Sequence, residues 1–450
     1  MKNLTWLLPL LVATIPVSAQ KKVDRKTLSN LQTHVNYLSS DKLEGRRTGA
    51  PGEQLAAAYI SSQMQQIGLS PKGDEGFLQT FTVNETRVPA ANCAMTLNHQ
   101  ALSPGAQFIP LPFSATKTMK GEVIPNVNEP DNIWLVNIQE IDNTKGKTKW
   151  QLYQQETLTA AKAGATGVIF YNGKESIAEV NDWLAQNPTP ASIPAVWVNN
   201  EVSKKLGNDD ANGFQITCQV AFQPMKRTGT NVIGYINNNA AATIVIGAHY
   251  DHLGFGEDHN GLGGEKVLYH GANDNASGIA AMLEIARQLK GSRLHNNNYL
   301  FVAFSGNEQG LSGSRHFVAG SDVAAVNYMI NLDMIGRLDA ANGLHISGVG
   351  TSPGWAAVLK EVSARETKLV LDSGASGPYD HTSFYKKNIP VLFFFTSNAD
   401  YHLPGDSADK INYDGTLTVM KVIYDIIDKT NSMGKLAFSN TREPQTAALK

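Results

Sequence analysis

The chain has 450 residues, of which 42% are hydrophobic and 17% charged, and its 38 basic and 40 acidic residues give a net charge of −2. This composition is too apolar for an intrinsically disordered protein. The balanced charge offers no electrostatic basis for binding nucleic acid or an anionic membrane surface. A chain of this length is expected to bury a large core and to form two or more domains.

The first residues have the three-part pattern of an export signal. Lys2 supplies the positive charge, residues 6–17 are apolar, and small residues end the stretch at Ala19. We therefore expect residues 1–19 to be a signal peptide and the mature protein to be exported, to the periplasm or the extracellular space. The alternative interpretation is a short buried helix.

Two further features bear on that environment. No later stretch is apolar over the length that a membrane span needs. Cys93 and Cys218 are the only cysteines, and in an exported protein they either form one disulfide or remain two buried thiols. The sequence does not give their separation, so both alternatives stay open.

Residues 20–90 are expected to begin the main domain with helices. Apolar residues recur at helical spacing from Leu28 to Leu38. Pro51 and Gly52 interrupt the pattern, which resumes from Gln54 to Ile67. Gly68 is placed to end that helix.

Residues 91–225 have a different texture and are predicted to be an inserted, β-rich module. Short β-prone segments at 121–124, 133–136, 167–170 and 195–198 are separated by prolines, and one helical segment is expected at 158–164. The segment contains no metal-ligand cluster and no nucleophile motif.

Residues 226–438 are expected to complete the main domain, followed by a flexible tail at 439–450. Apolar strands are predicted at 243–247, 299–304, 326–332 and 390–395, with helical stretches between them and a last helix at 416–428. Strands that alternate with helices in this way indicate an α/β fold, in which helices sandwich a mostly parallel mixed sheet.

Five candidate metal ligands fall at or after the ends of these strands: His249, Asp274, Glu308, Asp333 and His402. Carboxyl ends of parallel strands meet at one edge of a sheet, where α/β proteins bind ligands. Two imidazoles and three carboxylates suit a pair of zinc ions with one bridging carboxylate. Paired metals of this kind polarise a carbonyl and supply a hydroxide.

Other polar residues have weaker assignments. Asp251 is expected to accept the second N–H of His249 and to fix its tautomer, unless it only caps a turn. Asp380 and His381 offer a further ligand or orienting group, and His381 competes with His402 for the ligand role. Residues 257–270 include more acidic and imidazole groups, which we interpret as a solvated loop.

Together these motifs resemble the M28 family of zinc-dependent aminopeptidases and carboxypeptidases. The matching segments, in chain order, are LSSDKLEGRRTGAPG (38–52), AHYDHLG (248–254), GANDNASG (271–278), FSGNEQGLSGS (304–314), NLDMIG (331–336), PYDHTSF (378–384) and YHLPGDSADKI (401–411). The inserted module is similar, more weakly, to the protease-associated (PA) domain of some members, in KAGATGVIFYN (162–172) and IPAVWVN (193–199).

The resemblance implies a role for each site residue. His249, Asp274 and Asp333 would hold one zinc ion, and Asp274 would bridge to a second ion held by Glu308 and His402. Asp251 would be the orienting carboxylate of His249, and Tyr401 would stabilise the tetrahedral oxyanion. The implied function is an exported aminopeptidase that acts on peptides; the sequence predicts no oligomeric state.

One residue departs from the family pattern. Members usually have two consecutive glutamates where this chain has Asn307-Glu308. The first glutamate is the general base, and the Asn307 amide cannot accept a proton. Loss of general-base assistance typically slows a reaction by about 10²–10⁴-fold. Glu257, Asp258 and Glu265 are candidate replacements.

Two alternatives to an active aminopeptidase therefore remain. One is a catalytically weak or inactive homologue that binds peptides. The other is a one-zinc acyl transferase similar to glutaminyl cyclases. A serine hydrolase is disfavoured because the chain has no G-x-S-x-G motif, and the absence of H-E-x-x-H excludes the helix-borne zinc protease class.

Overall fold

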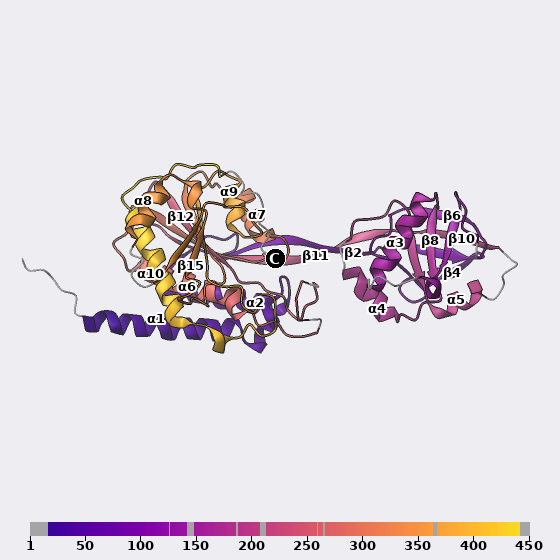
Figure 1. Cartoon of the computed structure of the whole chain (residues 1–450), viewed down its shortest axis with the longest axis horizontal. Coiled ribbons are helices and arrows are strands. Elements are labelled where there is room, and N and C mark those ends of the chain that lie inside the picture. Colours follow the sequence, from indigo (N-terminus) through magenta and orange to yellow (C-terminus); the bar gives the residue numbers. More distant parts are fainter. Residues whose placement is uncertain are drawn as a thin grey trace, which may run out of the picture. The chain divides into compact units, whose positions relative to one another are not determined.

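The computed structural model of the chain describes residues 17–125, 127–141, 148–185, 188–207, 213–258, 260–263, 266–362 and 367–441. The chain divides into two compact units, one made of residues 1–81 and 228–450 and the other of residues 82–227 (Figure 1). The predicted boundaries of the inserted module were residues 91 and 225.

The first unit is built on one mixed sheet. Among the described residues it has nine strands, in the order β1-β11-β13-β12-β14-β17-β15-β16, with β2 also paired to β11. Strands β13, β12, β14 and β17 are parallel to one another, and β15 is parallel to β16, whereas β1, β11 and β15 join their neighbours antiparallel. The mostly parallel sheet confirms the predicted fold class. The strand bounds are β1 Ser70–Pro71, β2 Leu78–Pro89, β11 Phe222–Ile236, β12 Thr243–His249, β13 Asn298–Phe304, β14 Val326–Leu332, β15 Leu344–Ser347, β16 Leu369–Asp372 and β17 Val391–Phe395.

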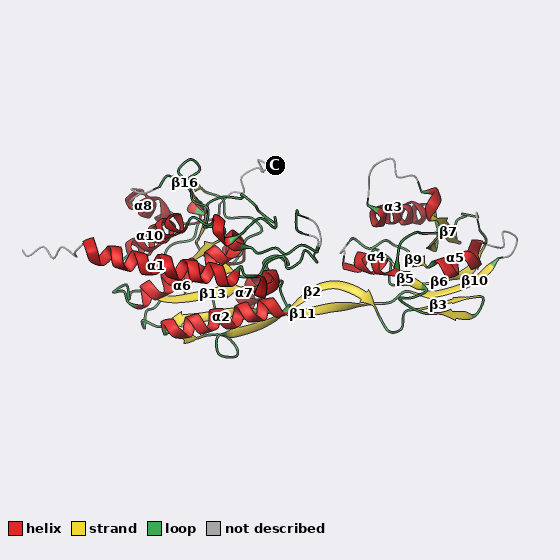
Figure 2. Ribbon diagram, turned by 90° about the horizontal axis from the view of Figure 1, so that it is seen from below, coloured by secondary structure: helices red, strands yellow, loops and turns green. Residues whose placement is uncertain are grey.

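Helices cover both faces of this sheet (Figures 1 and 2). Because successive strand residues point to opposite faces, Ile244 and Ile246 of β12 join one core while Val245 joins the other. The larger core includes α1 (Val17–Leu38), α2 (Pro51–Ile67), α6 (Ser277–Lys290), α8 (Gly354–Glu361) and α10 (Tyr413–Thr430). The smaller core includes Phe317 of α7 (Ser312–Gly320) and Phe384 of α9 (His381–Tyr385). Burial on both faces explains why the central strands read as continuous apolar runs.

The register of the central strands aligns their carboxyl ends. His249 pairs with Phe304, Gly247 with Asn331, and Leu332 with Phe394. The residues that follow each strand therefore emerge at the same edge of the sheet, which is where the sequence places its candidate ligands.

The second unit contains two four-stranded sheets among its described residues. One is antiparallel and consists of β4 (Gln100–Leu102), β3 (Ala94–Leu97), β10 (Phe214–Gln219) and β6 (Thr118–Val123). The other consists of β5 (Phe108–Pro110), β9 (Ala195–Val198), β8 (Gly167–Tyr171) and β7 (Ile133–Asn137). Its helices are α3 (Lys149–Lys162), α4 (Ile177–Asp182) and α5 (Asn200–Gly207).

Two details of this unit answer open points from the sequence. Helix α3 begins nine residues before the predicted segment at 158, and the Gln151 side chain accepts a hydrogen bond from the Thr148 N–H at its start (3.2 Å). Cys93 and Cys218 are buried free thiols, so the disulfide alternative is not formed.

The ends of the chain are described only in part. Helix α1 begins at Val17 and runs through the predicted cleavage point, while residues 1–16 of the predicted signal peptide lie outside the described residues. No helix in the described part of the chain is long and apolar enough to cross a membrane. Ser439 and Asn440, in the predicted tail, are hydrogen-bonded to Thr351 and Tyr385, and residues 442–450 lie outside the described part.

Candidate metal centre

Three of the predicted ligands meet at the end of β12. The Nε2 atom of His249 lies 3.3 Å from Asp274 Oδ1 and 3.4 Å from Asp333 Oδ1. All three side chains are buried, and their ligand atoms lie within 4.8 Å of one another, a spacing at which one ion can contact them all. These residues come from the end of β12, the turn before α6 and the end of β14.

The other two predicted ligands form a second group beside the first. His402 Nε2 lies 3.3 Å from Glu308 Oε2 and 3.6 Å from Asp274 Oδ2. Asp274 thus turns one carboxylate oxygen toward His249 and the other toward His402. The structure therefore brings all five predicted residues together, with Asp274 shared between the two groups.

The position of Asp274 is set by main-chain hydrogen bonds. It lies in an irregular helical turn, Ala272–Ala276, that precedes α6. The N–H groups of Asn273 and Asp274 both donate to the buried Asp406 carboxylate at 2.9 Å. Asn275 accepts from the Met334 N–H at 3.1 Å and donates to Leu332 O at 2.9 Å, which fastens this turn to the end of β14. The two asparagines of the GANDNASG motif thus hold the turn that carries Asp274 to the neighbouring loops.

Asp251 connects the first group to the loop that carries Glu308. Its carboxylate accepts hydrogen bonds from the N–H groups of Asn307 and Glu308, both at 3.2 Å, and from Thr48 Oγ1 at 3.0 Å. His249 Nδ1 lies 3.1 Å from the main-chain oxygen of Asp251 and 3.6 Å from its carboxylate. The nearest acceptor for this imidazole is therefore the carbonyl oxygen, and the carboxylate mainly holds the backbone of the next ligand loop.

Arg46 fastens the N-terminal segment to both ligand loops. Its side chain is fully buried and donates to the main-chain oxygens of Tyr250 (2.7 Å), His270 (2.8 Å), Gly271 (2.9 Å) and Leu38. Burial lowers the pKa of Arg46 to about 10, and the nearby carboxylates, Asp274 first among them, oppose this shift. The guanidinium thus supports the backbone beside His249 and Asp274 without forming part of either ligand group.

The buried charges at this centre favour a bound cation. Burial acts to lower the pKa of His249, but Asp333 and the other adjacent carboxylates raise it well above its ordinary value. Burial also acts to lower the pKa of His402, which Glu308 and Asp274 raise to about 9. Burial and neighbouring carboxylates raise the pKa of Asp333 despite His249. The raised pKa values of these three residues show that the carboxylates give the centre an excess of negative charge, which bound metal ions would neutralise.

Carboxylate oxygens without a hydrogen-bond partner support the same conclusion. Among the described residues, the buried atoms Asp274 Oδ2 and Asp333 Oδ1 have no hydrogen-bond partner. Leaving buried charged oxygens without a partner is costly, so such atoms normally bind a donor or a metal. Imidazole nitrogens with carboxylate oxygens are a donor set that zinc accepts, and the residues present therefore fit zinc.

Asn307 lies beside a buried carboxylate. Its amide nitrogen donates to Asp380 Oδ2 at 2.9 Å, and Asp380 Oδ1 has no hydrogen-bond partner among the described residues. Burial raises the pKa of Asp380 to about 6, although nearby His249 opposes the shift. Asp380 is therefore the carboxyl group that directly contacts the position of the missing general base.

The loop residues suggested as replacement bases are engaged elsewhere. Asp258 pairs with Arg47 through two contacts, at 2.6 and 3.0 Å, and also accepts from Gln309 at 2.7 Å. Glu257 has a 43% exposed side chain and caps the Phe255 N–H at 2.7 Å. Glu265 lies outside the described residues.

The remaining predicted residues take distinct positions. Tyr401 is 44% exposed and stacks on the His402 ring, with centroids 3.9 Å apart. His381 stacks on Phe393, with centroids 4.9 Å apart, and belongs to neither of the two ligand groups that share Asp274. Burial lowers the pKa of His381 to about 3, so its ring stays neutral. His402 faces Asp274 and Glu308, and we therefore keep His402 rather than His381 as the candidate ligand.

The sequence interpretation missed one residue at this centre. His252 is buried, and its Nδ1 lies 3.4 Å from Glu308 Oε1 and 3.8 Å from Asp274 Oδ2. Its ligand atom forms a second candidate metal group with those of Asp274 and Glu308. The signal available in the sequence was a second imidazole three residues after His249.

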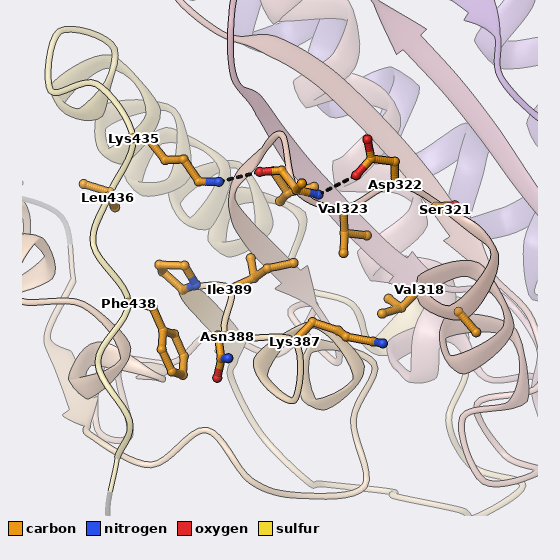
Figure 3. Close-up of a pocket in the computed structure, with 14 residues that line it drawn as sticks. Val318, Ser321, Asp322, Val323, Lys387, Asn388, Ile389, Lys435, Leu436 and Phe438 are labelled. Atoms are coloured by element: carbon orange, nitrogen blue, oxygen red, sulfur yellow. Dashed lines mark hydrogen bonds between the residues drawn. The ribbon is translucent and has the colours of Figure 1, made fainter.

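A separate pocket of about 470 Å³ lies at the opposite edge of the sheet (Figure 3). Its walls include the start of β14 at Val326, the segment before β17 at Ile389, and Phe438. Lys435 at its rim is hydrogen-bonded to the main chain at Ala324. None of the predicted site residues lines it. Because parallel strands carry ligand sites beyond their carboxyl ends, the metal centre is the stronger functional candidate.

Known proteins share this architecture. Aminopeptidase YwaD of Bacillus subtilis (strain 168) is 28% identical over 277 residues, which cover 58% of this chain and 56% of that relative. The chain thus spans little more than half the length of this curated relative. In fold, it is similar to an aminopeptidase from Aneurinibacillus sp. strain AM-1, with a TM-score of 0.54, 22% identity and coverage of 94% of this chain and 99% of the other.

A second similar structure is BSAP, a zinc aminopeptidase from Bacillus subtilis, with a TM-score of 0.53, 21% identity and coverage of 90% and 95%. Residues 231–427 match the model of peptidase family M28. This segment contains both ligand groups and the strands that position them. In this segment the chain is therefore similar to peptidase family M28.

Proposed function

We propose that this protein is a zinc aminopeptidase that removes N-terminal residues from peptides with two zinc ions bound at the sheet edge. The observation that carries the proposal is the pair of donor groups that share Asp274. His249 and Asp333 complete one group, and Glu308 and His402 complete the other. The match of residues 231–427 to a peptidase family supports peptides as the substrate class.

The side chains divide the work as follows. His249, Asp274 and Asp333 would hold the first ion, and Asp274, Glu308 and His402 would hold the second. Zinc bound in this way would polarise the scissile carbonyl and lower the pKa of the attacking water. Asp251 holds the loop that carries Glu308 close to His249, because its carboxylate accepts hydrogen bonds from two main-chain N–H groups of that loop.

Tyr401 acts as a hydrogen-bond donor to the developing oxyanion. Burial, followed by the nearby carboxylates Glu308, Asp274 and Asp333, raises the pKa of Tyr401. The phenol therefore keeps its proton at neutral pH. Its stacking on His402 holds the ring beside the second ligand group while its edge stays accessible to substrate.

Asp380 takes the proton that Asn307 cannot. The Asn307 amide nitrogen points to Asp380, so its amide oxygen is left to accept a hydrogen bond from the attacking water. One oxygen of Asp380 anchors that amide and the other has no partner in the described structure. An ionised carboxyl group with a free oxygen at this position is suited to general-base work.

The second candidate function is a peptide-binding homologue that does not turn over, and Asn307 is the observation that favours it. Replacing Asn307→Glu separates the two readings. In a silent protein the new carboxylate raises activity by orders of magnitude. In the enzyme that we propose it places a second carboxyl group against Asp380, and like charges at this distance disfavour ionisation. Activity then rises little or falls.

The direct test uses the purified mature chain loaded with zinc and a panel of aminoacyl anilides. We expect turnover of substrates with a free α-amine and none of the N-acetylated counterparts. Glu308→Gln should abolish turnover, whereas the matched change Glu361→Gln, at the end of α8, should leave it intact. Turnover of the N-acetylated set, or of neither set by a zinc-loaded protein, contradicts the proposal. Cyclisation of N-terminal glutamine without anilide cleavage supports the acyl transferase instead.

Two further assignments belong to the same proposal. The export pattern of residues 1–19 supports action outside the cytoplasm, on peptides in the periplasm or the extracellular space. The second unit corresponds to the segment that resembles PA domains, and we assign it a role in substrate selection. Deleting residues 91–225 should change the relative rates on long and short peptides; equal rates before and after deletion contradict that role.

A further inference from the structure

We propose that His252 is a ligand of the second zinc ion, so that this ion is held by four protein side chains and the first by three. The inference rests on the zinc binding proposed above. It adds an imidazole to the ligand set and makes the two metal positions unequal.

The His252 ring lies beside the two carboxylates of the second ligand group. Its side chain is 1% exposed, and its Nδ1 lies 3.4 Å from Glu308 Oε1 and 3.8 Å from Asp274 Oδ2. The corresponding distances from His402 Nε2 to the same two carboxylates are 3.3 and 3.6 Å. The two imidazoles thus face Glu308 and Asp274 at closely similar distances.

Both ring nitrogens of His252 lack a hydrogen-bond partner among the described residues. A buried polar group without a partner is costly. A ring nitrogen that faces two carboxylates at this distance needs positive charge between it and their oxygens. A zinc ion shared by these groups supplies that charge.

The ring is held in this direction by packing. The main-chain N–H of His252 donates to the main-chain oxygen of Arg46 at 3.1 Å, which fixes the backbone that carries the ring. The rings of Tyr269 and His402 stand edge-on to it, with centroids 6.5 and 6.0 Å away. A Cβ atom at Gly271 would lie 2.6 Å from His252 Cδ2, so only glycine leaves room for the ring there. The side chain is therefore oriented toward Glu308 even though Nε2 has no acceptor in the described structure.

The consequence is a division of labour between the metals. Zinc ions with four protein ligands are closed and structural, whereas catalytic ions keep an open position. The second position would have His252, His402, Glu308 and Asp274, and the first His249, Asp333 and Asp274. We infer that the second ion binds more tightly and that the open position for substrate or water lies at the first.

X-ray absorption at the zinc edge tests the inference without reference to activity. Wild-type protein with two zinc ions should show three imidazoles for two ions, and His252→Ala should show two for two. Two imidazoles for two ions in the wild type overturn the inference. This count needs no variant to fold.

Zinc affinity gives the second readout, by competition with a chelator. We expect His252→Ala to weaken the tighter zinc equivalent by at least tenfold, while the exposed His295→Ala leaves both equivalents unchanged. Equal affinities in wild type and His252→Ala overturn the role of His252 but leave the aminopeptidase proposal intact. Failure of the wild type to bind zinc overturns both. Zinc binding with three imidazoles but without peptide turnover contradicts only the proposed activity.

Discussion

Replacing Arg46→Met probes how far the metal centre depends on a residue outside it. The guanidinium is fully buried and donates to four main-chain oxygens. Hydrogen bonds to a charged group contribute about 1.5–3 kcal/mol each. Dehydration of the buried charge offsets several kcal/mol of that sum. We expect a net loss of about 3–5 kcal/mol, because four main-chain oxygens lose a charged donor while the dehydration cost of the guanidinium is removed.

A loss of this size is a large share of the stability of a typical domain, about 5–15 kcal/mol. It should fall on the first unit, because all four acceptors, which include Tyr250 and Gly271, belong to that unit. Hydrogen–deuterium exchange of peptides covering β12 and β13 measures it there without interference from the second unit. The control is Arg25→Met, an exposed position on α1 where we expect a change within about 0.5 kcal/mol.

The metal site should respond as well. Arg46 supports the backbone just after His249 and just before Asp274, so its loss should lower zinc affinity in any protein that still folds. Protection of β12 amides in Arg46→Met within 1 kcal/mol of the wild type would show that the four carbonyl contacts are not needed, and would refute the reasoning.

Three other results are expected. Asp251→Asn replaces an acceptor oxygen with a donor against the Asn307 and Glu308 N–H groups, so zinc affinity measured by chelator competition should fall by about 10–100-fold; unchanged affinity would show that Asp251 has no part in ordering the site. Asp380→Asn should lower kcat by about 10²–10⁴-fold with zinc content unchanged. The wild type should lose activity below about pH 6, where Asp380 takes up a proton, or at a lower pH if bound zinc depresses that pKa; an acid limb that persists in a residually active Asp380→Asn contradicts the assignment. His402, with its pKa raised from 6.5 to about 9, stabilises the metal-free protein below pH 6.5 and loses that effect as the pH rises through 9. Zinc displaces this proton, so isothermal titration should show tighter binding as the pH approaches 9; affinity that falls with pH contradicts the ion pair.

Much of the sheet could be predicted because its central strands are buried on both faces. Strand β14 has the predicted bounds, and β13 and β17 differ from the prediction by a single residue at the start. Strand β12 extends two residues further, through His249 itself. The short strands β15 and β16 were not predicted, because four-residue segments with partly exposed faces carry little periodic signal.

The ligand set followed from the same logic. Each predicted ligand lies at or shortly after an element end that the apolar pattern marks, and parallel strands bring such ends together. The roles of His252 and Asp380 depend instead on the paths of loops. His252 faces Glu308 only because the chain turns after β12, and Asp380 meets Asn307 across 73 residues of sequence. No local pattern encodes either contact.

The central claim is that residues from four strand ends and one helix start bind two zinc ions that share Asp274. Anomalous diffraction at the zinc edge, from crystals of the zinc-loaded mature protein, tests it most directly. We predict two peaks, one among His249, Asp274 and Asp333 and the other among Asp274, Glu308 and His402. A single peak, or peaks that lie away from Asp274, would contradict the account.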